Sequence, residues 1–174
     1  MTASEVFESV TGSGSSDFAV LVRILEKHGP WCLIGGLAVN CYVEPVYTLD
    51  ADIVVVSAKL PAIKEELTAA GFDVQEFPRP FNAKMSGSDL RIQLTLDPRY
   101  QEFLNHSQAA EVLGERVPVA SLVDVTRGKV WAWSDQKRRA TKRKKDELDL
   151  MRILEAYPDT RALMPEEIRN QVPE

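Results

Sequence analysis

Two stretches of the chain carry apolar residues at the three- and four-residue spacing of an amphipathic helix. Glycine follows both stretches, and proline joins it after the first, which is how many helices end. The two stripes are Phe18, Leu21, Val22 and Leu25, followed by Gly29 and Pro30, and Leu60, Ile63, Leu67 and Ala70, followed by Gly71. We therefore expect one helix before residue 29 and another before residue 71.

Strands are predicted where apolar residues form short runs or alternate with polar residues. Residues 90–97 alternate strictly, so aliphatic side chains share one face and polar side chains, among them Gln93, share the other. Other strands are expected at residues 31–34, 49–57, 72–75 and 81–85, with a hairpin at 111–119 through Gly114. Residues 53–56 are apolar on both faces, which is typical of a central strand.

Further helices are expected at residues 37–43 and 100–106, and a helix beginning at Ser121 has Asp124 in the capping-box position. After a long basic loop, a last apolar stripe marks a helix that packs back on the domain and ends before Pro158; its members are Leu150, Ile153, Leu154 and Tyr157. The pattern as a whole predicts an α+β fold. Its centre is a small mixed, twisted sheet, covered by helices on one face and closed by C-terminal helices.

Composition narrows the class of protein. At 174 residues and 44% hydrophobic content the chain suits one core better than two, so we expect a single domain over residues 1–174. Its core is expected at about residues 15–157, with a helical tail over 158–174. No apolar stretch reaches 18 residues, and the N-terminal segment carries acids where a secretory signal carries bases. These features predict a cytoplasmic protein without a membrane span.

The two cysteines, Cys32 and Cys41, lie in apolar surroundings and outside any metal-binding spacing. We interpret them as reduced thiols of the core, with a disulfide or a metal as the alternatives.

The net charge of −5 conceals a basic segment. Residues 137–145 (KRRATKRKK), from Lys137 to Lys145, contain seven bases and no acid, which leaves 14 bases and 26 acids, or −12, elsewhere. Such a segment is often a solvated face or loop, and it also suits a polyanion or an acidic partner surface. A protein or RNA partner is one hypothesis for it, and nothing indicates specificity for DNA.

Candidate chemistry gathers in residues 35–52. Asp50 and Asp52 are spaced to project from one face of a strand, where two carboxylates can share a divalent cation. Upstream, Gly35 and Gly36 follow a short apolar run and offer bare backbone amides to a phosphate. Each signal has a simpler interpretation, because the aspartates could cap neighbouring amides and the glycines could form a tight turn.

The order of these motifs resembles the nucleotidyltransferase superfamily of the DNA polymerase beta type. The segments IGGLAVNCY and YTLDADIVVV carry the resemblance, which is closest to small bacterial members of the abortive-infection toxin-antitoxin group and to small antibiotic nucleotidyltransferases. It continues through RIQLTLD, ERVPVASLVDV and KRKKDELDLMRIL, and it covers residues 15–157.

The resemblance implies a function and a set of site residues. Asp50 and Asp52 would bind Mg²⁺, and Gly35 and Gly36, with Thr48 nearby, would hold a nucleoside triphosphate. An acceptor hydroxyl would then attack the α-phosphate and release pyrophosphate.

The chain departs from the family pattern at the third carboxylate, whose place on the strand at 90–97 is taken by Gln93. Asp89 and Asp97 share that face, but each lies about 13 Å from Gln93 along a strand. A basic residue expected just before Thr48 is also missing, since Val46 and Tyr47 stand there.

Lys129 falls on the apolar stripe of the helix that begins at Ser121. It is expected either to snorkel past the core or to reach the nucleotide phosphates. Lys145, Asp146 and Asp149 are interpreted as a helix N-terminus with acids in its first turn. The side chains set aside as structural or without partners are Trp131, Trp133, His28 and His106.

Two functions follow as expectations. The first is a Mg²⁺-dependent nucleotidyltransferase whose hydroxyl acceptor is a protein, an RNA or a small molecule. The alternative, favoured by Gln93, is a catalytically weakened binding module or toxin-antitoxin component. A plain scaffold is the third interpretation, and it requires Asp50 and Asp52 to turn away from Gly36.

Overall fold

Seven strands form one mixed sheet in the computed structural model, which describes residues 12–75 and 81–173. The spatial order is β3-β4-β5-β2-β1-β7-β6, so β2 and β1 lie near its centre. The strands are β1 (Trp31–Ile34), β2 (Asp50–Val55), β3 (Phe72–Gln75), β4 (Phe81–Met85), β5 (Arg91–Thr95), β6 (Gln108–Val112) and β7 (Glu115–Val119). The strand segments expected from the sequence are all present, and the sheet is mixed, because β2 runs parallel to β5 and antiparallel to β1.

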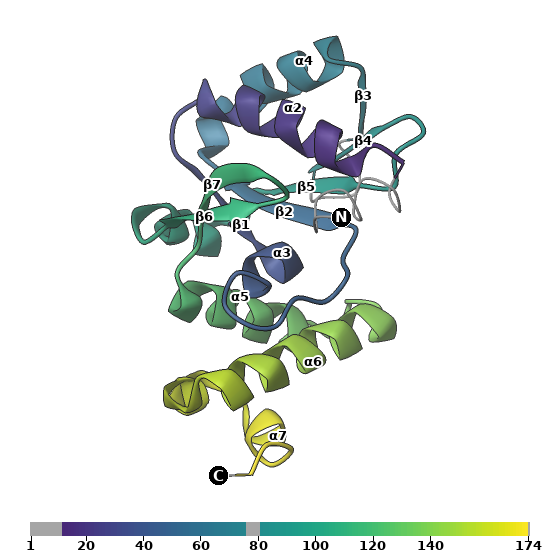
Figure 1. Cartoon of the computed structure of the whole chain (residues 1–174). Coiled ribbons are helices and arrows are strands. Elements are labelled where there is room, and N and C mark those ends of the chain that lie inside the picture. Colours follow the sequence, from purple (N-terminus) through teal and green to yellow (C-terminus); the bar gives the residue numbers. More distant parts are fainter. Residues whose placement is uncertain (1–11, 76–80, 174) are drawn as a thin grey trace.

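Helices cover both faces of this sheet (Figure 1). One face carries α2 and α4, and the other carries α3, α5 and, farther out, α6 and α7. The helices are α2 (Gly14–Glu26), α3 (Gly35–Val39), α4 (Leu60–Ala69), α5 (Leu122–Ser134), α6 (Ala140–Ala156) and α7 (Glu166–Arg169), with 3-10 turns η1 (Ser57–Lys59), η2 (Pro98–Asn105) and η3 (Pro158–Leu163). The α+β prediction is confirmed, with the C-terminal helices closing the second face.

The core lies on both sides of the central strands. Ile53 and Leu33 are fully buried, as the apolar pattern of their strands predicts. From the first face, the predicted stripes of α2 and α4 supply buried side chains, including Phe18, Leu21, Leu25, Ile63 and Leu67. Within residues 12–75 and 81–173, no helix is long and apolar enough to cross a bilayer.

Strand register decides where the polar side chains of the sheet meet. In the antiparallel pair of β1 and β2, Ile34 lies opposite Asp52. In the parallel pair of β2 and β5, Gln93 lies opposite Asp52 and Arg91 opposite Asp50. Because side chains at paired positions share a face, the end of β1, both aspartates and Gln93 converge on one face of the sheet.

The basic segment differs from its prediction. It was expected to form a long loop, but α6 begins at Ala140, so residues 140–145 are helical. The helix has no acid in its first turn, and Asp146 and Asp149 lie farther along it, buried. The expectation of a helix N-terminus with acids in its first turn is therefore wrong. The physical reason for this difference is that both acids pair with Lys129 across the α5–α6 contact and not with amides at the helix end.

Smaller differences concern helix type and ends. The helix expected at residues 37–43 begins at Gly35 and ends at Val39, and the segment after β5 is a 3-10 helix rather than an α-helix. The helix start at Ser121 is confirmed, because the Ser121 side chain accepts a hydrogen bond from the Asp124 backbone amide at 3.2 Å.

Both cysteines are free, with Cys32 buried and Cys41 half-buried. Burial, with a smaller contribution from the negative charge of Asp124, raises the pKa of Cys32 to about 12. The thiol is thus held protonated at neutral pH, in agreement with a core role.

Candidate functional site

Gly35 lies directly against the carboxylate of Asp52. Its φ of 70° is in the left-handed region, where glycine is favoured. A Cβ added at Gly35 would lie 2.1 Å from Asp52 Oδ2, which is too close for any side chain. The contact follows from the strand register, since Gly35 leaves β1 one residue after the partner of Asp52.

Gly36 and Thr48 form the second contact between the two motifs. A Cβ at Gly36 would lie 3.4 Å from Thr48 Oγ1, and the same oxygen accepts a hydrogen bond from the Asp50 backbone amide at 3.3 Å. The glycine pair and the Thr48–Asp52 segment, predicted as one site, are therefore adjacent. The scaffold interpretation required the aspartates to turn away from the glycines, and Asp52 does the opposite.

Asp50 is bound by two cations. Arg91 Nε donates to its Oδ1 at 2.6 Å, and Lys142 Nζ donates to its Oδ2. Burial alone would raise the pKa of Asp50, but Lys142 and Arg91 outweigh it and hold the pKa below its usual value. Sequence reasoning did not assign either cation to the site. Arg91 could have been found from its place two residues before Gln93, whereas Lys142 lies 92 residues from Asp50 and gives no local signal.

Asp52 has the opposite electrostatic environment. Burial, assisted by the charge of Asp50, raises its pKa to about 6, although Lys129, Lys142 and Arg138 act in the other direction. Within the described parts of the chain, no base lies within ion-pair distance of this carboxylate, so its charge is only partly compensated. A half-buried carboxylate with a raised pKa is typical of a functional position.

Gln93 stands beside Asp52 on the neighbouring strand, where the resemblance leads us to expect a third carboxylate. Its two nearest acidic alternatives are engaged elsewhere, because Asp97 pairs with Arg99 at 2.7 Å and Asp89 lies 3.9 Å from Lys84. Among residues 12–75 and 81–173, no group of three or more His, Cys, Asp or Glu side chains is placed to hold one metal ion. The site thus offers two carboxylates and one amide.

Lys129 ends between two carboxylates of α6. Its Nζ lies 3.0 Å from Asp146 and 2.8 Å from Asp149, and only 10% of the side chain is exposed. Burial lowers the pKa of Lys129, but the two acids more than offset this and hold it above its usual value. Lys129 does not snorkel to solvent. It joins α5 to α6 at the wall of the site.

A pocket of about 730 Å³ opens between the sheet, α5 and η2. Its lining brings together the predicted residues Gly35, Asp52, Gln93 and Lys129, with Arg138 from the basic segment. Arg138 is fixed by Asp146, to which its Nε donates at 2.6 Å. Asp50 lies beside this pocket and is not part of its lining.

Aromatic rings form another part of the pocket lining. Tyr100 meets Phe103 and Trp131 edge-on, at centroid distances of 5.1 and 5.2 Å, while Phe103 stacks on Trp131 at 5.7 Å. The Arg99 guanidinium lies over the Trp131 ring, 4.8 Å from its centroid. Trp131 therefore packs as expected, and in addition it borders the pocket.

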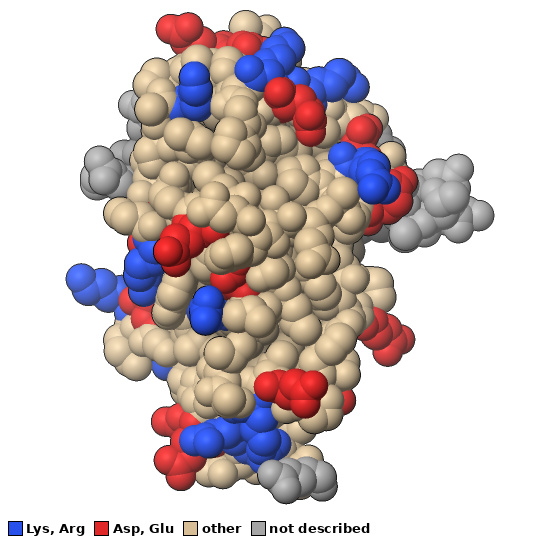
Figure 2. Space-filling model, turned by 90° about the vertical axis from the view of Figure 1, so that its left-hand side faces the viewer, with Lys and Arg blue, Asp and Glu red and all other residues tan. Residues whose placement is uncertain are grey.

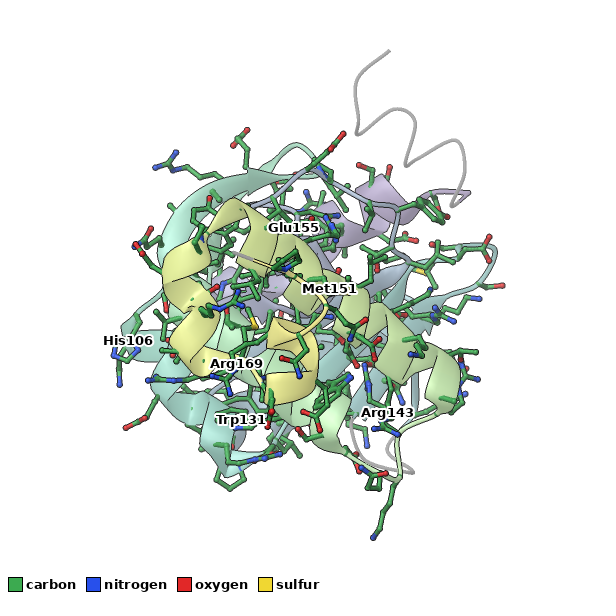
Figure 3. All side chains as sticks on the ribbon, turned by 90° about the horizontal axis from the view of Figure 1, so that it is seen from below. His106, Trp131, Arg143, Met151, Glu155 and Arg169 are labelled. Carbon is green, nitrogen blue, oxygen red and sulfur yellow. The ribbon has the colours of Figure 1, made fainter. Side chains whose placement is uncertain are left out.

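The histidines have partners that the sequence did not indicate. His28 Nε2 lies 2.7 Å from Glu66 Oε1, and His106 Nδ1 lies 2.9 Å from Asp124 Oδ2. Figure 3 shows His106 at the periphery of the molecule. The two contacts lie outside the cluster of Asp50, Asp52 and Gln93.

Comparison with solved structures places this geometry among known folds. The antibiotic-resistance factor ANT(2″)-Ia, in complex with adenylyl-2″-tobramycin, superposes with a TM-score of 0.57 at 15% identity over 88% of this chain and 91% of its own. The lincosamide adenylyltransferase LnuA, bound to lincomycin, gives 0.52 at 13% identity over 78% and 94%. A nucleotidyltransferase-like protein from Paracoccidioides brasiliensis gives 0.56 at 19% identity over 82% and 75%.

The chain has the nucleotidyltransferase fold. No protein-family model matches it, and no curated protein is significantly similar to it in sequence. The nucleotidyltransferase fold is thus recognised through the backbone, while the sequence has diverged. A shared fold does not determine function, which depends on the residues of the site.

The contact between Gly35 and Asp52 predicts a specific cost for a methyl group. Gly35→Ala should lower the free energy of unfolding by about 3 kcal/mol, because it combines left-handed strain with overpacking against Asp52. Gly29→Ala is the matched control, since Gly29 also has a positive φ (89°) but no atom within 4 Å of an added Cβ. It should cost only about 1 kcal/mol. If urea denaturation showed equal losses in the free energy of unfolding for both variants, the close contact between Gly35 and Asp52 would be contradicted.

The raised pKa of Asp52 predicts an unusual pH dependence. Between the ordinary aspartate pKa and about 6, the folded protein holds a proton that the unfolded chain has lost, so stability falls as pH rises through that window. In chelator at pH 7.5, Asp52→Asn should therefore raise the free energy of unfolding by about 2 kcal/mol and flatten the profile. Asp97→Asn should not stabilise, because Arg99 lowers the pKa of Asp97. If Asp52→Asn instead lowered the free energy of unfolding, the ionised Asp52 carboxylate would not be unfavourable in the folded protein.

Proposed function

We propose that the protein binds a nucleoside triphosphate with Mg²⁺ and transfers a nucleoside monophosphate to a hydroxyl group. The proposal rests above all on one observation, the meeting of Gly35 with Asp52 and of Gly36 with Thr48 beside a pocket of about 730 Å³. A glycine turn that leaves room for nothing larger, next to two carboxylates on one strand face, suits a phosphate held against a cation.

The donor set is compatible with Mg²⁺. Asp50, Asp52 and the amide oxygen of Gln93 share one face of the sheet, and all three are hard oxygen donors. When bound, a divalent cation would neutralise charge on the attacking and leaving oxygens. Gln93 supplies no charge, so we expect a weaker metal site than three carboxylates would form.

Backbone amides and positively charged side chains near this cluster could bind phosphate groups. Gly35 and Gly36 have no side chains to shield their backbone amides, and the Thr48 hydroxyl lies beside Gly36. Lys129 and Arg138 line the same pocket, although each is already paired with carboxylates of α6. Because these carboxylates offset part of their charge, we expect Lys129 and Arg138 to attract a phosphate less strongly than unpaired bases would.

Aromatic side chains line part of the pocket. Tyr100, Phe103 and Trp131 pack against one another there, Phe103 is only 2% exposed, and Arg99 is stacked on Trp131. Base stacking on aromatic rings is tolerant of base identity, so a nucleobase in contact with Tyr100 or Trp131 would be held without selection of one base.

In the proposed transfer, the acceptor oxygen bonds to the α-phosphorus as the bond to the β-phosphate oxygen breaks, and pyrophosphate leaves. The hydroxyl proton must pass to a base. Gln93 cannot take it, so the candidate acceptors at the paired positions of β2 and β5 are the carboxylates of Asp50 and Asp52.

The charges of the pocket bear on the class of acceptor. ANT(2″)-Ia and LnuA are described with antibiotic ligands, and an aminoglycoside is polycationic. Five acids line the pocket here. Asp97, Asp124 and Asp146 are paired with bases of this chain, whereas Asp52 and Asp135 form no ion pair within the described residues. The lining therefore leaves two carboxylates for a cationic group of an acceptor.

A protein or RNA acceptor bound through residues 137–145 stays a prediction. Arg138 and Lys142 turn inward to Asp146 and Asp50, and Arg143 donates to the Trp133 carbonyl at 2.9 Å. The bases of the segment that remain exposed are Lys137, Arg139, Lys144 and Lys145. Figure 2 shows the side of the molecule away from the start of α6, where acids and bases are interspersed.

A second function, a binding module with weakened or lost catalysis, is favoured by two observations. Gln93 replaces a charged metal ligand, and both oxygens of Asp50 are already bound by Arg91 and Lys142. Such a module would keep the nucleotide pocket and would serve as a binding or toxin-antitoxin component.

Calorimetry with ATP, CTP, GTP and UTP in Mg²⁺ tests the proposed site. We expect micromolar binding of at least one nucleotide, weakened at least about tenfold by Asp50→Ala plus Asp52→Ala, because the metal and phosphate lose both charged ligands. Asp73→Ala plus Asp89→Ala removes the same charge from exposed positions and should have no effect. Absence of nucleotide binding, or an unchanged double variant, would rule out the site. Label transferred from the nucleotide to protein or RNA would distinguish the enzyme from the binding module.

Position 93 predicts a gain of function. Gln93→Glu restores a third carboxylate beside Asp52 with little change of shape, so Mn²⁺ affinity and label transfer should both rise at least about tenfold. Gln93→Leu, which has no oxygen, should lower the Mn²⁺ affinity. If both variants bind Mn²⁺ like the parent protein, residue 93 is no part of a metal site.

A further inference from the structure

The Lys142 ammonium lies on the side of the Asp50 carboxylate where a metal ion would bind. The ammonium binds Oδ2, while Arg91 Nε binds Oδ1 at 2.6 Å, so both carboxylate oxygens are occupied by cations of the chain itself. We infer that Lys142 competes with a divalent cation for Asp50, and that the cation binds only when the Lys142 ammonium leaves. The inference rests on the proposed function, whose metal site it qualifies.

The two cations differ in how easily they can leave. Arg91 projects from β5, where it is paired in register with Asp50, so its backbone is held by the sheet. Lys142 comes from the first turns of α6, and its ammonium reaches the carboxylate through a flexible four-carbon stem. Only 23% of its side chain is exposed, against 48% for Arg91. Lys142 is therefore the more enclosed of the two cations, and its backbone belongs to α6 and not to the sheet.

The position of Lys142 differs from that of neighbouring bases. Lys144 and Lys145 on the same helix are exposed, and Lys144 forms only an i,i+3 pair with Glu147 at 3.1 Å. Lys142 instead turns from α6 to the sheet and contacts a residue 92 positions earlier. Its charge acts on both carboxylates, since it lowers the pKa of Asp52 as well as that of Asp50.

Charge balance gives the physical reason for this arrangement. Two carboxylates on one strand face repel each other unless cations compensate them. Arg91 and Lys142 both bind Asp50, and the charge of Lys142 also acts on Asp52, so the pair is partly compensated without a metal. A divalent cation brings the same charge as these two bases, so it can replace this compensation only if a base withdraws from the carboxylate.

Metal binding to charge-selective variants tests the competition. Mn²⁺ affinity would be measured by calorimetry and by electron paramagnetic resonance, without nucleotide. Lys142→Ala should bind Mn²⁺ about fivefold to tenfold more tightly than the parent, as expected when one partly buried ion pair no longer competes. Lys142→Arg keeps a competing cation and should not gain affinity. Lys145→Ala, an equal charge change at an exposed position of the same helix, should change the affinity less than twofold.

A second measurement follows the lysine itself. Acetic anhydride labelling of the parent protein, read by mass spectrometry, should modify Lys142 faster when Mn²⁺ is added, while labelling of Lys145 stays constant. Tighter binding by Lys142→Ala together with this increase would support the inference. Equal Mn²⁺ affinity in all variants, or Lys142 labelling that is insensitive to bound Mn²⁺, would overturn it and leave the proposed nucleotide site intact. Failure of every variant to bind Mn²⁺ would overturn both the competition and the metal of the proposed function.

Discussion

The pairing of β2 with its two neighbours is the constraint on which the site depends. Asp52 lies opposite Ile34 on one side and Gln93 on the other. These two pairs bring the glycine turn, the carboxylates and the amide to one face of the sheet. A slip of one residue would turn Asp52 toward the opposite face, so the hydrophobic core that fixes the register also fixes the chemistry.

Charge compensation is the second organising interaction. Lys129 and Arg138 bind Asp146, and Asp149 binds both Lys129 and Arg152, so a buried network joins α5 to α6 beside the pocket. A buried charge is tolerated only with partners, which makes the position of α6 depend on these pairs. Through Lys142 the same helix also reaches Asp50. The packing of the C-terminal helices and the electrostatics of the aspartate pair are therefore coupled.

This protein shares the backbone fold of nucleotidyltransferases, but its site lacks one of the residues that the resemblance leads us to expect. The backbone superposes on nucleotidyltransferases at 13–19% identity, and the glycine turn and aspartate pair stand in contact. Gln93 stands where the resemblance leads us to expect a third carboxylate, and Asp50 is bound by two cations. Such changes leave the fold unaffected, because Asp50 and Gln93 are half-buried side chains outside the apolar core. They alter only the chemistry that the fold can support.

The sequence by itself determined what depends on local pattern. Local pattern predicted the helix stripes, the alternating strands and the helix start at Ser121. It also indicated the order of the glycine pair and the two aspartates along the chain, and the amide of Gln93 on the strand at 90–97. Only the tertiary structure decided which distant charges meet. Lys142 with Asp50, and Lys129 with Asp146 and Asp149, are pairs between separate elements that no periodicity records. The basic segment was misread as a loop for the same reason, because its inward bases are stabilised by carboxylates that lie elsewhere in the chain or farther along the helix.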